Sequence, residues 1–260
     1  MELAIDGNTN LNKMKKIYYI FLILLLNSCS YILELKMDGD IIESEIDLPV
    51  FDTIVLESSC NIIFDESNTD IIRMEGIDFI IDNYIFTTDS NRLKIKHNKE
   101  THLQEKRVGN IYLSSKNIKH IIINAPCKLK SNDTIYFNNL NITINSRGGY
   151  AETDINLMGN KLQYYAFGKA NQSLNRLSGE VKELRTTIEG AAKLYGNDLK
   201  TDKINISQKS LSDVYLNVSN NLDAKIYSSG NIYYIGKPEI NFEKVETQIF
   251  NSSGKVVENN

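Results

Sequence analysis

The stretch Leu140–Lys161, LNITINSRGGYAETDINLMGNK, decides how the fold of this chain is interpreted. Its first part places apolar residues at Leu140, Ile142 and Ile144, with the period of two that is typical of a half-buried strand. A turn of small and polar residues, SRGG, follows, and a second alternating segment, ETDINLM, comes after it. Strand, turn and strand within 22 residues predict a β unit without a helix.

The same pattern recurs on both sides of this stretch. Between residues 118 and 239 the chain divides into six segments of 22, 22, 22, 20, 18 and 18 residues, most of which open on an alternating strand. A period near 20 residues with strands and no helix is typical of a β-solenoid, in which the inward apolar residues of each coil stack on those of the next. We therefore predict an all-β solenoid with coils of about 18–22 residues. A β-sandwich with evenly spaced strands remains the alternative.

The N-terminus carries the features of an exported, lipid-anchored protein. Ile17–Leu26 is an apolar run preceded by Lys13, Lys15 and Lys16, and it is too short to span a bilayer, which needs about 20 residues. The end of the run, LNSC, resembles the lipobox of bacterial lipoproteins, in which the peptide is cut before the cysteine and the thiol carries a diacylglycerol. We therefore expect lipidation of Cys29. An ordinary signal peptide begins at Met14, which we expect to be the true start of the protein.

The chain after the signal peptide consists of short strands rich in β-branched residues, and a polar stretch interrupts them at one point. The predicted organisation is a signal peptide over 1–28, a lipidated tether over 29–39, an N-terminal β half over 40–97, a polar loop over 98–110, repeated coils over 111–250 and a C-terminal tail over 251–260.

Two further cysteines, Cys60 and Cys127, each follow a strand and a small turn. If both occupy the same corner of different coils, the 67 residues between them correspond to about three coils, or roughly 14 Å. A disulfide needs Cα atoms within about 7 Å of each other. We therefore predict no disulfide and two buried thiols that behave as small apolar groups.

These patterns resemble a known family. The segments IIESEIDLPVFDTIVLESSCNIIFDES, IIRMEGIDFIIDNY, NRLKIKH and AKIYSSGNIYYIGKPEI are similar to those of the head-GIN-domain "putative auto-transporter adhesin" lipoproteins of Bacteroidetes. The likeness covers residues from about 40 to 240, and it rests on structural glycines and apolar positions. The resemblance implies a right-handed parallel β-helix at the cell envelope, and it brings no substrate or catalytic residue.

Composition narrows the classes of function. The chain has 29 Lys and Arg against 33 Asp and Glu, a net charge of −4, and these charges are mixed along the sequence without a basic stripe. We therefore expect no nucleic-acid partner. The histidines His97, His102 and His120 lack metal-ligand spacing, and no nucleotide-binding motif is present. We expect no metal and no cofactor.

One strand carries a possible catalytic group. Glu152 and Asp154 share a face of a predicted strand with Tyr150, next to Arg147. Carboxylates two residues apart on a strand are separated by about 7 Å, which lies within the window for inverting glycosidases. The alternative is the solvent face of an ordinary coil, where acidic residues are common.

Two tyrosine pairs are candidates for stacking on sugars. Tyr164–Tyr165 and Tyr233–Tyr234 each place one ring inside and one ring outside a predicted strand. Tyrosines are also ordinary strand residues, so this pattern is compatible with a purely structural role.

The sequence therefore leads to an outer-membrane lipoprotein, anchored through Cys29, whose solenoid binds or scaffolds an envelope protein or a glycan rather than catalysing a reaction. The alternatives are a carbohydrate-active β-helix enzyme and a periplasmic sensor that docks a partner by strand addition. A groove with clustered acidic and basic residues on adjacent coils would favour the enzyme, and an uncovered end strand would favour the sensor. The residues after Cys29, SYILE, lack a run of acids, which favours the periplasmic side over the cell surface.

Overall fold

A computed structural model describes residues 16–18, 39–66, 71–98, 108–246 and 252–259 of the chain. The chain divides into two compact units, Met1–Asp40 and Ile41–Asn260. The predicted signal peptide (1–28) and tether (29–39), including Cys29, lie outside the described residues except for 16–18 and 39, as do residues 99–107 of the predicted polar loop. Among the described residues, no helix is long and apolar enough to cross a membrane.

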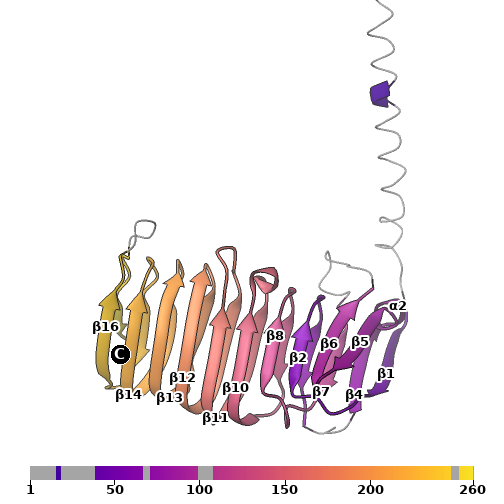
Figure 1. Ribbon diagram of the computed structural model, residues 1–260, viewed down its shortest axis with the longest axis horizontal. Coiled ribbons are helices and arrows are strands. Elements are labelled where there is room, and N and C mark those ends of the chain that lie inside the picture. Colours follow the sequence, from indigo (N-terminus) through magenta and orange to yellow (C-terminus); the bar gives the residue numbers. More distant parts are fainter. Residues whose placement is uncertain (1–15, 19–38, 67–70, 99–107, 247–251, 260) are drawn as a thin grey trace, which may run out of the picture. The chain divides into compact units, whose positions relative to one another are not determined.

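From Ile41 onward, the described residues form one 17-stranded sheet, whose strands lie side by side along the solenoid in Figure 1. The strands are β1 (Ile41–Asp47), β2 (Thr53–Leu56), β3 (Asn61–Phe64), β4 (Ile71–Ile77), β5 (Tyr84–Asp89), β6 (Arg92–His97), β7 (Asn110–Leu113), β8 (His120–Ile123), β9 (Lys128–Ser131), β10 (Ile135–Ile144), β11 (Glu152–Ala166), β12 (Leu174–Gly190), β13 (Lys193–Ser210), β14 (Val214–Ile226), β15 (Ile232–Ile235), β16 (Glu239–Lys244) and β17 (Val256–Glu258). A short helix, α2 (Asp78–Ile81), and a 3-10 turn, η2 (Ser146–Gly148), complete the elements.

The long strands β11 to β14 each run along two faces of the solenoid. On face A, Leu140–Ile144 of β10 pairs in parallel with Leu162–Ala166 of β11. On face B, Lys128–Lys130 of β9 pairs in parallel with Glu152–Asp154 of β11. Parallel pairing of successive coils on both faces confirms the predicted parallel β-solenoid, which has about 6 turns with coils about 22 residues apart.

One inward column shows how the sequence repeat becomes a core. Leu140 pairs with Leu162, which pairs with Leu184, then Ile204 and then Leu222. All five side chains are buried. The offsets along this column are 22, 22, 20 and 18 residues, so the apolar residues that open the sequence segments lie directly above one another. Because no single coil can bury its apolar face, stacking supplies the stability.

A small polar network lies inside this core. The hydroxyl of Tyr164 donates to Asn175 Oδ1 at 2.7 Å and lies 2.6 Å from Thr153 Oγ1. The amide of Asn175 donates in turn to Ser173 Oγ at 3.0 Å and to the Lys193 carbonyl at 2.8 Å. Burial raises the pKa of Tyr164 well above its usual range. The network is therefore neutral and satisfied, as buried polar groups must be.

The order of coils in space departs from the order in sequence near the N-terminal end. Strand β2 pairs with both β6 and β8, and β3 pairs with both β7 and β9. Figure 1 shows β2 between β8 and β6. The intervening segment folds back, since β4 pairs antiparallel with β1 and β7, and β5 pairs antiparallel with β6. An early coil is thus inserted between two later ones.

This non-sequential order of coils overturns the prediction that Cys60 and Cys127 lie about three coils apart. Asn61 pairs in register with Lys128, so Cys60 and Cys127, the residues just before them, belong to adjacent coils and not to coils three apart. The predicted separation was wrong because it equated sequence distance with the number of coils. In the structure both residues are free and buried thiols.

The C-terminal end of the solenoid differs from the prediction as well. Residues 251–260 were expected to form a tail, but β17 within them pairs in parallel with β15 and so extends face B. On face A, β16 continues the inward columns with Ile240 and Phe242, which are 40% and 39% exposed. Among the described residues β16 has a residue-by-residue pairing with β14 alone, which leaves the kind of edge that the sensor hypothesis requires.

Candidate functional site

A polar groove runs across successive coils at the start of face A, with a volume of about 640 Å³. Two outward columns line it, because residues on either side of an inward strand position point to solvent. The first column is Asn139, Lys161, Glu183, Lys203 and Asn221. The second column is Gln163, Arg185, Asn205 and Asp223. Each coil therefore contributes one or two polar side chains to one continuous surface.

The groove carries both signs of charge, with an excess of one cation. Three basic residues, Lys161, Arg185 and Lys203, face two acidic ones, Glu183 and Asp223. Lys161 Nζ lies 3.8 Å from Glu183 Oε2. Within the described part of the chain, neither Arg185 nor Lys203 has an ion-pair partner. Two cations are therefore available to a ligand.

A second hollow of about 410 Å³ adjoins the first, because Asn139 lines both. Its wall is more aromatic and includes Phe51, Phe137 and the largely exposed Tyr136. Lys119 Nζ donates to Asp52 Oδ2 at 3.1 Å, and this bond lowers the pKa of the Asp52 carboxyl below its usual range. The polar groove thus continues into a surface with exposed aromatic character.

The predicted acidic pair lies elsewhere. Glu152 and Asp154 are exposed on β11, as expected, but they belong to face B and do not line the polar groove. Glu152 Oε2 lies 3.9 Å from Lys128 Nζ, and Asp154 stands in register between Lys130 and Arg176. Asp154 therefore has a basic residue on each neighbouring coil, whereas Glu152 has Lys128 on one side and Leu174 on the other.

Arg147, the third member of that predicted cluster, is exposed in η2 and likewise does not line the groove. The two carboxylates therefore belong to a solvent-facing row of mixed charge, in which an exposed ion pair contributes less than about 1 kcal/mol.

The two tyrosine pairs follow the predicted arrangement, one ring inside and one ring outside, only in part. Tyr164 is 0% exposed, so its proposed role in stacking on a sugar is wrong. Tyr165 points outward, stacks on Phe167 at 5.2 Å between ring centroids, and lies 3.3 Å from the amide of the groove residue Gln163. Tyr234 is half-buried and packs against the core.

Tyr233 belongs to a row that sequence reasoning missed. Tyr195, Tyr215 and Tyr233 are in register on face B, with ring centroids 5.3 and 5.2 Å apart and interplanar angles of 6° and 14°. Because the rings cover each other's faces, mainly their edges are left for solvent. Stacking on a sugar needs a free ring face, so this row is poorly suited to it.

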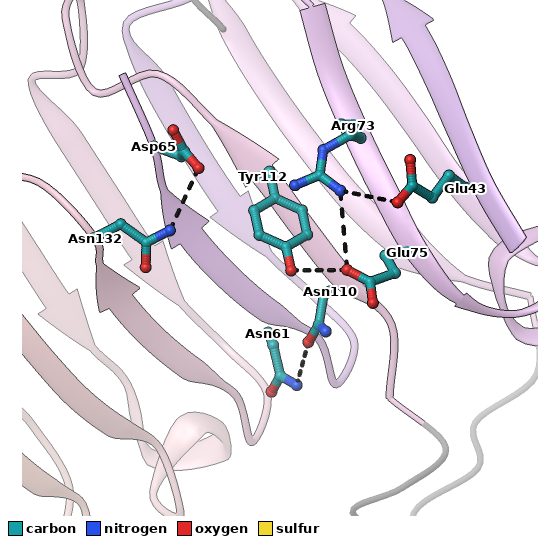
Figure 2. Close-up of polar contacts among 8 residues, drawn as sticks. All are labelled: Glu43, Asn61, Asp65, Arg73, Glu75, Asn110, Tyr112 and Asn132. Carbon is teal, nitrogen blue, oxygen red and sulfur yellow. Dashed lines mark hydrogen bonds and ion pairs between the residues drawn. The ribbon is translucent and has the colours of Figure 1, made fainter. Parts of the chain in front are cut away.

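A polar cluster at the other end of face B ties the first strands together, as Figure 2 shows. The guanidinium of Arg73 lies 3.8 Å above the Tyr112 ring and 3.5 Å from Glu43 Oε1. The Tyr112 hydroxyl donates to Glu75 Oε2 at 2.8 Å. Burial, together with this carboxylate, raises the pKa of Tyr112. These groups satisfy one another across β1, β4 and β7, which fits a structural role.

Several solved structures are similar to this chain over most of its length. A "putative adhesin" from Bacteroides fragilis aligns with a TM-score of 0.69 at 17% identity, over 85% of this chain and 98% of that chain. One from Parabacteroides merdae aligns with a TM-score of 0.63 at 18% identity, over 86% and 98%. A "putative lipid binding protein" from Parabacteroides distasonis aligns with a TM-score of 0.59 at 16% identity, over 86% and 98%. At these identities the likeness establishes the fold.

Sequence comparison places the family. No curated protein matches the chain. The profile of the family described as "putative auto-transporter adhesin, head GIN domain" matches residues 50–238, which include the groove, the tyrosine row and all but the outermost coils. The chain therefore belongs to the head GIN domain family.

Proposed function

We propose that this protein is a non-catalytic adhesin of the cell envelope whose polar groove holds an extended, acidic glycan. The observation that carries the proposal is the pair of cations, Arg185 and Lys203, which line an open groove without acidic partners among the described residues. A cation that has no partner in the protein is available for a charge-assisted hydrogen bond to a ligand.

The shape and chemistry of the groove suit a glycan chain. Its first column runs from Asn139 to Asn221 over five strands, or four inter-strand spacings of about 4.8 Å each, which is long enough for several linked sugar rings. The amides of Gln163, Asn205 and Asn221 both donate and accept hydrogen bonds, as sugar hydroxyls require. Exposed Tyr136 in the adjoining hollow offers an aromatic surface.

The charges favour carboxylate or sulfate groups on that glycan. An arginine fork matches the geometry of a carboxylate in a bidentate contact, and a lysine adds a point charge. A lipid acyl chain, in contrast, would desolvate Arg185 and Lys203 without offering them partners, which is costly. We therefore place an acidic sugar polymer ahead of a lipid as the ligand.

Arg185→Ala and Lys203→Ala are each expected to weaken binding of a hexagalacturonate probe by about tenfold or more. Each variant removes a charge-assisted hydrogen bond, of about 1.5–3 kcal/mol, and about 1.4 kcal/mol corresponds to a tenfold change in Kd. Titration calorimetry at low and moderate salt measures this, and affinity should fall as salt rises.

Arg176→Ala is the matched control, because Arg176 is an exposed arginine on the same strand, β12, but on face B. It should leave affinity unchanged. A neutral oligosaccharide of equal length should bind more weakly than the uronate. Equal loss in the Arg176 and Arg185 variants, or no preference for the uronate, would contradict the proposal.

Hydrolysis of the bound glycan is the second candidate function, because the groove meets the condition of mixed charges on adjacent coils. Its carboxylates, Glu183 and Asp223, stand on strands two coils apart, and Glu183 is engaged by Lys161. We expect no release of reducing ends from the probe during long incubation. Cleavage that Glu183→Gln abolishes would overturn the non-catalytic role.

Anchoring in the outer membrane through lipidated Cys29, with the solenoid on the periplasmic side, is the second part of the proposal. We expect wild-type protein in the membrane fraction and Cys29→Ala in the soluble fraction. Protease added to intact cells should leave the protein undigested until the outer membrane is opened.

Digestion on intact cells would instead place the domain on the cell surface. A Cys29→Ala protein that remained in the membrane fraction would contradict lipid anchoring. The wild-type protein, fractionated alongside the variant, is the control.

A further inference from the structure

We propose that Cys60 and Cys127 form a disulfide bond that joins two coils which are neighbours in space but 67 residues apart in sequence. The bond would link the coil containing β3 to the coil containing β9. The proposal concerns the oxidised form of the protein, because the structure contains both residues as free thiols.

The backbone holds the two cysteines at corresponding positions. Asn61 and Lys128 are paired in register, and the Lys128 amide donates to the Cys60 carbonyl at 3.2 Å. Residues paired across adjacent strands have Cα atoms about 4.8 Å apart. This spacing lies within the range of about 4.4–6.8 Å that disulfides span. The coil spacing is therefore compatible with a bond.

The two thiols also share one environment. Both belong to the continuous apolar core, and Cys60 is 0% exposed while Cys127 is 6% exposed. Burial raises the pKa of both thiols, that of Cys127 to about 12, and the proximity of Cys127 raises the pKa of Cys60 further. Because the thiolate is the reactive species, native thiols should be inert at neutral pH. Oxidation must therefore precede closure of the core.

The reaction is a thiol–disulfide exchange during folding, and it rests on the proposed export to an oxidising compartment. One protein thiolate attacks the disulfide of an envelope thiol oxidant and forms a mixed disulfide. The second protein thiolate attacks the protein-side sulfur and releases the oxidant. Two protein thiols become one disulfide, and the oxidant disulfide becomes two thiols, so protons and electrons balance.

The position of the bond gives it a structural consequence. The loop that it closes contains β4 to β7, the segment that folds back so that β2 and β3 lie between later strands. A link at this point fixes the non-sequential order of the coils. Cross-links over long loops restrict the unfolded chain most.

The test uses the full chain with Cys29→Ala, so that Cys60 and Cys127 are its only thiols. The protein is unfolded in reductant, refolded in oxidised and reduced glutathione, quenched with an alkylating agent in denaturant, and weighed by mass spectrometry. We expect the refolded protein to carry no alkyl group and to lose about two mass units. Its Tm should exceed that of the reduced protein by roughly 5–15 °C.

Two results would overturn the proposal. One is native-like protein in which both thiols are alkylated after oxidative refolding. The other is a mixed disulfide with glutathione on one cysteine with no internal bond. A Cys60→Ser variant controls for the oxidant, because it should show only the mixed disulfide and no gain in Tm. The assay uses purified protein and does not depend on export. A negative result would therefore contradict the disulfide without bearing on the proposed location of the protein.

Discussion

Tyr164→Ala is expected to lower the free energy of unfolding by about 3–5 kcal/mol. The side chain is 0% exposed and lies in the inward column between Ile142 and Thr186, so truncation leaves a cavity that the stacked coils on either side cannot close. It also removes the hydroxyl that satisfies Thr153 and Asn175 inside the core. Denaturant unfolding followed by circular dichroism measures the loss.

Tyr165→Ala is the matched control, because it removes the same atoms from the next residue on the outer side of face A. In the wild-type protein the Tyr165 ring stacks on Phe167 and contacts Gln163. Because the substitution removes only these surface contacts, we expect the free energy of unfolding to fall by less than about 1.5 kcal/mol. Tyr164→Phe should cost an intermediate amount, about 1–3 kcal/mol, because it leaves buried polar partners unsatisfied. Equal losses at both tyrosines would contradict the assignment of inside and outside.

Gly179→Ala is expected to destabilise the fold by about 2–5 kcal/mol, through backbone strain and a steric clash. Gly179 has φ of +104°, a conformation that residues with a Cβ rarely adopt. A Cβ there would lie 2.1 Å from the carbonyl oxygen of Leu157, the residue paired with Gly179 on the preceding coil. Relief would require the two coils to separate, which breaks their stacking. Thermal and denaturant unfolding measure the effect.

Gly196→Ala provides the comparison within the same solenoid. Gly196 is buried, the nearest atom to a Cβ placed there would be the Tyr215 carbonyl oxygen at 3.1 Å, and its backbone is not left-handed. A shift of a few tenths of an ångström accommodates the methyl group, so we expect a loss below about 1 kcal/mol. A loss as large as that at Gly179 would refute the role given to the positive φ.

The stacking of coils in the second half could be predicted because the repeat is local. Leu140, Leu162 and Leu184 open their sequence segments, and the same residues lie in one column of the structure. Each coil places an apolar residue at the same inward position. Because successive coils have nearly the same length, these residues recur at regular intervals in the sequence. The groove residues flank these inward leucines in the sequence, since Lys161 precedes Leu162 and Arg185 follows Leu184.

The sequence nevertheless did not reveal the groove, because no single strand carries all of its charged residues. Glu152 and Asp154 are close in sequence, so they were found, whereas Lys161, Glu183 and Lys203 come together only when coils are compared at the same position. The tyrosine row was missed for the same reason. In a solenoid, a surface is assembled across coils, one residue from each.

The sequence by itself determined the all-β class, the coil length and the inward positions, because alternation of apolar residues and turn residues are local properties of the chain. Only the tertiary structure decided that β2 and β3 lie between later strands, and hence that Cys60 and Cys127 lie in adjacent coils. The apolar patterns of the short N-terminal strands are compatible with more than one stacking order. The order is set by pairings between residues far apart in sequence, whose energies no local pattern reports.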